Sequence, residues 1–191
     1  MGYTLQLDGD TFAATDDNDL GHQLGKIVCV GRNYAAHAAE LNNPIPTEPI
    51  LFMKPATAAA EIDSYFSIPS GRGSCHIETE IAVLIGSELC RASESQALEA
   101  VAGIGIGLDL TLRDLQTSLK DKGLPWEKAK AFDGSCPLTG FMSPAADEDY
   151  AKLGLVLKRN NVIQQEGDSG QMLNPIITLL SYISEHFTLM P

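Results

Sequence analysis

The sequence has no apolar run that approaches the roughly 20 residues of a membrane-spanning helix. Residues 1–10 also lack the basic and apolar regions of a signal peptide. The four cysteines form no Cys-x-x-Cys pair, which argues against a zinc ribbon or a disulfide framework and favours reduced thiols. We therefore expect a cytoplasmic protein.

Positive charge is scarce, with 13 Lys and Arg against 25 Asp and Glu, for a formal net charge of −12. Such a surface repels phosphate backbones and anionic lipid, so neither nucleic acid nor a membrane is expected as a partner. Aromatic residues are few, at 6%, but the hydrophobic fraction of 44% is that of an ordinary globular protein. A chain of 191 residues can bury about 70% of its surface, which is enough for a core.

Short strands outnumber helices in the hydrophobic pattern. The expected strands cover residues 3–7, 11–14, 26–30, 50–53, 79–85, 103–110, 153–159 and 162–165. The expected helices cover residues 33–41, 93–101, 111–120 and 175–186. The pattern predicts a mainly β fold with short helices (α+β).

Several local signals support these boundaries. Asp8-Gly9 and Asn160-Asn161 are turn pairs between strands and predict two hairpins. Ser93 and Gln96 have the spacing of a capping box at the start of a helix. The alternating glycines of the strand at 103–110 lack the spacing of a dinucleotide-binding turn and predict a close approach of another backbone segment.

Two glutamates begin the apolar strand at 79–85. Glu78 and Glu80 are two residues apart, so their side chains share one face of the strand, with Cβ atoms roughly 7 Å apart. Two carboxylates in this arrangement can bind one cation, although a solvated strand end would show the same spacing.

Asp109 is the only charged residue of the apolar run at 103–110, and an acid in a buried strand needs a partner. Three carboxylates suit a hard ion such as Mg²⁺ or Mn²⁺. His76 continues the same face as Glu78 and suits a softer metal, or lies at the surface.

His37 and Glu40 lie three residues apart in the expected helix at 33–41. Glu40 is close enough to orient His37 and raise its basicity, as a general base requires, and an incidental surface pair would have the same spacing. Lys130 belongs to a mixed-charge stretch in which a solvated lysine is the ordinary expectation.

The order of several blocks resembles the fumarylacetoacetate hydrolase family, in its small single-domain branch. The blocks are GRNYAAHAAE at 31–40, LFMKP at 51–55, ETEIAVLIG at 78–86, GLDLTLRDLQ at 107–116, KAKAFD at 128–133 and CPL at 136–138. The branch includes acylpyruvate hydrolases, oxaloacetate decarboxylases and 2-hydroxydienedioate isomerases. The resemblance implies a mixed β-sandwich roll that is usually a homodimer.

The resemblance also implies a role for each matching residue. It makes Glu78, Glu80 and Asp109 the ligands of Mg²⁺ or Mn²⁺, and His37 with Glu40 the catalytic dyad. The catalytic Lys130 and the substrate-binding residues Gln116 and Arg32 match positions at or beside the substrate.

The implied reaction is hydrolysis of a C–C bond in an acylpyruvate or related 2,4-dioxo acid, through a pyruvate enolate. Decarboxylation of an oxaloacetate-type 2-oxo acid and isomerisation of a 2-hydroxydienedioate are alternatives, because both need the same enolate stabilisation. A binding-only or catalytically impaired fragment is a third reading.

The resemblance divides the chain into an N-terminal hairpin extension at 1–25 and a catalytic domain at 26–191. It also implies that relatives continue for roughly 25–30 further residues, with a Gly-Asp turn and a Thr-Gly-Thr-Pro loop, without which a sheet edge would be unpaired.

Overall fold

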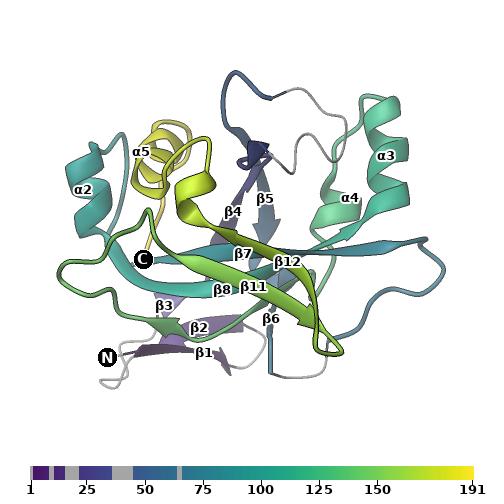
Figure 1. The fold of residues 1–191 in the computed structure, drawn as a ribbon, viewed down its shortest axis with the longest axis horizontal. Coiled ribbons are helices and arrows are strands. Elements are labelled where there is room, and N and C mark those ends of the chain that lie inside the picture. Colours follow the sequence, from purple (N-terminus) through teal and green to yellow (C-terminus); the bar gives the residue numbers. More distant parts are fainter. Residues whose placement is uncertain (1, 9–10, 16–21, 36–44, 64–65) are drawn as a thin grey trace. The chain divides into compact units, whose positions relative to one another are not determined.

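The computed structural model describes residues 2–8, 11–15, 22–35, 45–63 and 66–191 of the chain. Strands dominate and the helices are short, so the predicted class, mainly β with short helices, is confirmed (Figure 1). The strands are β1 (Gly2–Asp8), β2 (Thr11–Thr15), β3 (His22–Gln23), β4 (Lys26–Gly31), β5 (Ile50–Pro55), β6 (Ala59–Glu61), β7 (Cys75–Ile85), β8 (Val101–Leu112), β9 (Cys136–Leu138), β10 (Phe141–Met142), β11 (Gly154–Arg159) and β12 (Val162–Asp168). The α-helices are α2 (Glu94–Glu99), α3 (Arg113–Asp121), α4 (Glu127–Lys130) and α5 (Ile176–His186). Two 3₁₀ turns, η1 (Ala56–Ala58) and η2 (Ser169–Gln171), complete the set.

The chain forms two compact units. The first comprises Met1–Ile27, Met53–Leu84 and Gly103–Ser143, and the second comprises Val28–Phe52, Ile85–Ala102 and Pro144–Pro191.

The first unit contains most of an eight-stranded sheet. Its order is β3-β2-β1-β10-β8-β9-β6, and β7 pairs with β8 outside this path. The predicted hairpin of β1 and β2 is confirmed, with Thr4 opposite Thr15. β6 pairs with β9 in parallel, whereas β10 and β9 pair antiparallel with β8. The long strands β7 and β8 therefore lie side by side.

Two apolar clusters pack within this unit. One is built on Ala58, Ala59, Cys136, Leu138 and Phe141, and the other on Leu112, Leu119 and Ala129. The glycines of β8 allow the first cluster to close, because a Cβ on Gly105 would lie 2.9 Å from the Gly140 carbonyl oxygen. The predicted close approach at these glycines is confirmed.

In the second unit, α2 packs beside α5, and β11 pairs with β12 (Figure 1). The predicted capping box is present, since the Ser93 side chain accepts from the Gln96 N–H and the Gln96 side chain accepts from the Ser93 N–H. Asn160 and Asn161 have φ angles of 49° and 64°, as the two-residue turn predicted between β11 and β12 requires.

Some boundaries differ from the prediction. Residues 111–112 were expected to be helical, but Thr111 and Leu112 are buried and extend β8, so α3 begins at Arg113. The C-terminal helix begins one residue later than expected, because Pro175 is its N-cap residue. The expected helix at 33–41 falls largely outside the described residues. No helix in the described part of the chain is long and apolar enough to cross a membrane.

Candidate active site

The predicted carboxylates are on two neighbouring strands of the first unit. Glu78 and Glu80 are on β7, and Asp109 is on β8, which pairs with β7. Asp109 is only 7% exposed, and the side chain of Glu78 is 16% exposed. Adjacent strands thus concentrate negative charge at a largely buried point.

Lys130, at the end of α4, connects two of these carboxylates. Its Nζ lies 2.9 Å from Glu78 Oε2 and 2.5 Å from Asp109 Oδ2. Burial favours the neutral amine, but Asp109 and Glu78 outweigh burial and raise the pKa of Lys130. The lysine is therefore a cation held between two acids, and the solvated lysine that composition alone favoured is not what the structure shows.

Glu80 is the third acid of the group. Burial raises its pKa to about 8, with further contributions from the negative charges of Asp109 and Glu78. The three carboxylates are thus close enough to repel one another, and their number exceeds what Lys130 alone balances.

Lys54, on β5, is completely buried and faces the same group. Its Nζ lies 2.9 Å from Asp109 Oδ1. It also donates to the Lys130 carbonyl oxygen, to the Ser135 carbonyl oxygen at 3.1 Å and to Ser135 Oγ at 3.2 Å. One ammonium therefore connects a strand acid to the turn that follows α4.

Arg113 and Gln116 lie in the first turns of α3. Arg113 donates from Nη2 to Glu78 Oε1, from Nη1 to Gln116 Oε1 at 2.6 Å and from Nε to His76 Nδ1 at 3.4 Å. Gln116 is buried, and since its oxygen faces Arg113, its amide nitrogen is the end that can donate elsewhere. The start of α3 therefore borders the carboxylates.

Three features of this group fit a hard divalent cation. The donors are carboxylate oxygens, a cationic Lys130 already bridges two of them, and the buried Asp109 Oδ1 accepts no hydrogen bond within the described residues. As they stand, no three His, Cys, Asp or Glu side chains in the described ranges are arranged to hold a metal ion. The assignment of Glu78, Glu80 and Asp109 as metal ligands stays a prediction.

Of the remaining predicted residues, the structure describes only Arg32, which belongs to the second unit. Arg32 follows β4 with a φ of 57°, an uncommon conformation for a residue with a side chain. The next residue, Asn33, is buried and bonded to Asn174 through both ends of its amide. His37 and Glu40 lie outside the described residues, so the proposed dyad has no structural description.

Two residues of the cluster had no role in the sequence analysis. Lys54 and Arg113 appeared there only as letters of the blocks at 51–55 and 107–116. The sequence did contain a signal for Lys54, because a lysine in an apolar strand needs a buried partner as much as Asp109 does. The corresponding signal for Arg113 was a cation four residues after Asp109.

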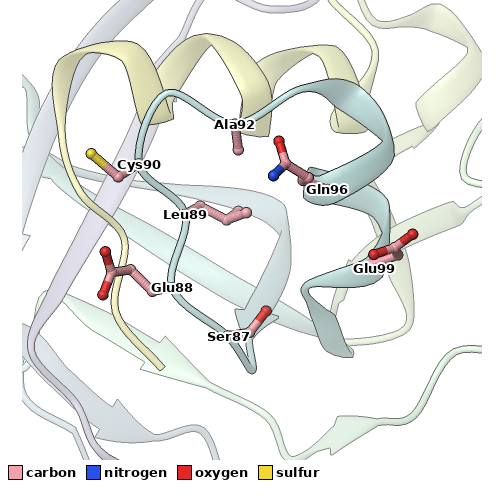
Figure 2. A pocket seen from close by; sticks show the side chains of 7 residues that line it. All are labelled: Ser87, Glu88, Leu89, Cys90, Ala92, Gln96 and Glu99. Atoms are coloured by element: carbon pink, nitrogen blue, oxygen red, sulfur yellow. The ribbon is translucent and has the colours of Figure 1, made fainter.

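A separate hollow of about 220 Å³ lies in the second unit. Its lining comes from the segment between β7 and α2 and from α2 itself (Figure 2). The lining residues are Ser87, Glu88, Leu89, Cys90, Ala92, Gln96 and Glu99. None of the predicted site residues lines it, and the carboxylate and lysine group is the better candidate for chemistry.

Comparison with known proteins defines the class. The family described as fumarylacetoacetate (FAA) hydrolase C-terminal matches residues 26–191, and the chain belongs to this family. It is an enzyme family, and the mixed, strand-rich fold described above is the fold of its members.

Two relatives of the chain are named oxaloacetate tautomerases. The chain is 48% identical to the oxaloacetate tautomerase YcgM of Escherichia coli over 172 residues, which cover 89% of this chain and 78% of that protein. It is 41% identical to the human mitochondrial oxaloacetate tautomerase FAHD1 over 163 residues, 85% of this chain and 74% of that protein.

A solved structure of fumarylpyruvate hydrolase from Pseudomonas aeruginosa, in complex with Mn²⁺ and pyruvate, matches with a TM-score of 0.86 and 33% identity over 98% of this chain and 83% of that one. An Oleispira antarctica protein provisionally named a fumarylacetoacetate isomerase/hydrolase matches with a TM-score of 0.86 and 58% identity, over 91% of this chain and 80% of that one.

Proposed function

We propose that this chain catalyses the metal-dependent keto–enol isomerisation of an oxaloacetate-type 2-oxo acid. The observation that carries the proposal is the group of Glu78, Glu80, Asp109 and Lys130 in a chain 48% identical to an oxaloacetate tautomerase. The relatives named oxaloacetate tautomerases support an isomerisation over C–C hydrolysis, with an oxaloacetate-type acid as the substrate in place of the 2-hydroxydienedioate expected for an isomerase.

Glu78, Glu80 and Asp109 would hold Mg²⁺ or Mn²⁺, since all three offer hard oxygen donors from β7 and β8. When bound, a divalent ion withdraws electron density from the oxygens of a 2-oxo acid and makes the neighbouring C–H more acidic. The similarity to a fumarylpyruvate hydrolase solved with Mn²⁺ and pyruvate supports this choice of ion and ligand class.

The protein's own groups would handle charge and protons. Lys130 is cationic and held beside two acids, so its ammonium can balance the charge that develops on the substrate oxygen. The amide nitrogen of Gln116, whose other end is fixed by Arg113, can donate to a substrate oxygen. The balance of the reaction is one proton removed from carbon and one added to oxygen.

We assign the proton transfer from carbon to His37, oriented by Glu40, on the basis of the sequence resemblance. Arg32, next to this segment, is the proposed partner of the second substrate carboxylate. These three assignments are made from the motif at 31–40.

The test follows the enol absorbance of oxaloacetate with Mg²⁺ or Mn²⁺, with and without the protein. We expect the chain to speed the approach to keto–enol equilibrium beyond the metal alone, with the mass of the solute unchanged. Asp109→Asn should abolish the acceleration. Wild-type protein that binds the metal and oxalate, a mimic of the enolate, but gives no acceleration would contradict the proposal and support a binding-only role.

C–C hydrolysis of an acylpyruvate is the second candidate. It is supported by the TM-score of 0.86 to the Pseudomonas aeruginosa fumarylpyruvate hydrolase. Product analysis separates the reactions, because hydrolysis gives pyruvate and a second acid, decarboxylation gives CO₂, and isomerisation gives no new mass.

A further inference from the structure

Four charged or polar oxygens surround the Lys54 ammonium, which has only three N–H donors. Its three N–H donors have three acceptors at the end of α4 and in the turn that follows: the Lys130 carbonyl oxygen, the Ser135 carbonyl oxygen and Ser135 Oγ. Asp109 Oδ1 is a fourth oxygen, at 2.9 Å. This oxygen is in Coulomb contact with Lys54 but accepts no hydrogen bond within the described residues.

Lys54 therefore compensates the charge of Asp109 Oδ1, although this oxygen is not one of the three acceptors of its N–H groups. A carboxylate oxygen that accepts a strong N–H bond must give it up, or share it, when a cation binds. Lys54 is completely buried, and all three of its N–H groups donate to oxygens of Lys130 and Ser135. The position of its ammonium is therefore fixed. Ser135 Oγ in turn donates to the Lys130 carbonyl oxygen at 2.9 Å, which closes the network.

We propose that Lys54 is a positioning residue of the metal site: it orients Asp109 as a ligand without occupying its donor oxygen, and it fixes the end of α4, which carries Lys130. The inference rests on the proposed metal site. Lys54 has no contact with the substrate in this role and acts through Asp109 and Lys130.

The test measures Mn²⁺ affinity by calorimetry and by electron paramagnetic resonance, without substrate. Lys54→Met keeps most of the length of the side chain and removes the charge. We expect it to weaken Mn²⁺ binding by ~10-fold to 100-fold, the range typical for groups that orient metal ligands. Lys158→Met, on the exposed part of β11, is the matched control and should bind as the wild type does.

A double-mutant cycle distinguishes positioning from a general structural effect. If Lys54 acts through Asp109, then adding Lys54→Met to Asp109→Asn should change Mn²⁺ affinity by less than about 2-fold. The double variant also removes both charges of the Lys54–Asp109 pair together, so it is expected to fold even where Lys54→Met alone, which leaves Asp109 with Lys130 as its ammonium partner, does not.

Three outcomes decide between the ideas. Wild-type protein without Mn²⁺ binding would refute the proposed function itself. Wild-type binding together with unchanged affinity in Lys54→Met would overturn only the role of Lys54. If Lys54→Met lowers Mn²⁺ affinity by the same factor in the wild-type and the Asp109→Asn backgrounds, the role of Lys54 is also overturned. Equal factors would mean that Lys54 and Asp109 act independently.

Discussion

Lys130 lies between two acids whose oxygens a divalent cation would also need. Its Nζ contacts Glu78 Oε2 and Asp109 Oδ2 at 2.9 and 2.5 Å. A metal ion and this ammonium would therefore compete for the same negative charge, although the proposed reaction uses both.

This competition predicts opposite effects of one substitution. Lys130→Met should lower kcat by roughly 10²–10³-fold, the usual cost of losing one electrostatic stabiliser. Mn²⁺ affinity, measured by calorimetry without substrate, should stay level or rise, because the competing cation is gone. Asp109→Asn is the comparison and should lower both kcat and Mn²⁺ affinity. A Lys130→Met variant with much weaker Mn²⁺ binding would contradict the competition.

Two cysteines, Cys90 and Cys136, differ in burial. Burial raises the pKa of the Cys136 thiol to about 12, and Cys136 packs in the first apolar cluster. Cys90 is exposed. A thiolate is the reactive form, so a neutral, buried thiol reacts slowly.

We expect an alkylating reagent near pH 8 to modify Cys90 in the folded protein and Cys136 only after unfolding. Peptide mass spectrometry at successive times measures the two rates. Equal rates at both positions in folded protein would contradict the burial of Cys136.

At the scale of elements, α3 is connected to the segment before β7 through one carboxylate. Asp114 accepts from the Ser74 N–H at 2.7 Å and from the Ser74 hydroxyl at 3.1 Å. These bonds, the backbone one first, lower the pKa of Asp114 from its ordinary value of 3.8. Gly73, with a φ of 83°, permits the contact, since a Cβ there would lie 2.2 Å from Asp114 Oδ2.

The sign of the pH dependence follows from this depressed pKa. In the folded state, Asp114 binds a proton less readily than it does in the unfolded state. Its contribution to stability is therefore present above the ordinary pKa and is lost as the pH falls through the lower pKa of the folded state. Asp114→Asn should therefore lower the unfolding midpoint near pH 7, and the gap to wild type should close towards about pH 3. Thermal unfolding followed by circular dichroism measures the gap, and a gap of constant size would contradict this account.

Some elements could be predicted from residues that are neighbours in the chain. The capping box at Ser93 and the turn at Asn160-Asn161 were predictable because each depends on neighbours in the chain. The short α4 and the parallel pairing of β6 with β9 were not predicted. Residues far apart in sequence form both, since Lys54 binds the end of α4 from β5 and Ala59 of β6 lies opposite Cys136 of β9.

At the scale of the whole molecule, the excess of acid has a partial explanation. Three of the 25 acidic residues lie together on β7 and β8, and Glu80 among them has a pKa of about 8 because of burial and its two acidic neighbours. A divalent cation at this group would relieve the repulsion and stabilise the folded state by mass action.

We expect free Mn²⁺ at about 100 times its Kd to stabilise the protein by about 2.7 kcal/mol, the value for a ligand that binds only the folded state. A thermal shift against an EDTA-treated sample measures the effect. Asp109→Asn should show no comparable shift at the same concentration, and an equal shift in both proteins would place the binding elsewhere.

The sequence by itself determined the strand-rich class, the turns and caps, and the types of donor in the site, because these depend on side-chain chemistry and on residues near in the chain. Glu78 and Glu80 share a face through the two-residue period of a strand, which needs no tertiary information. Only the tertiary structure decided that Asp109 lies on the adjacent strand, that Lys130 is a bound cation and not a solvated one, and that Lys54 and Arg113 belong to the group. The physical reason is that the role of a buried charge depends on partners tens of residues away in the sequence. Those partners come into contact only when β5, β7, β8, α3 and α4 pack together.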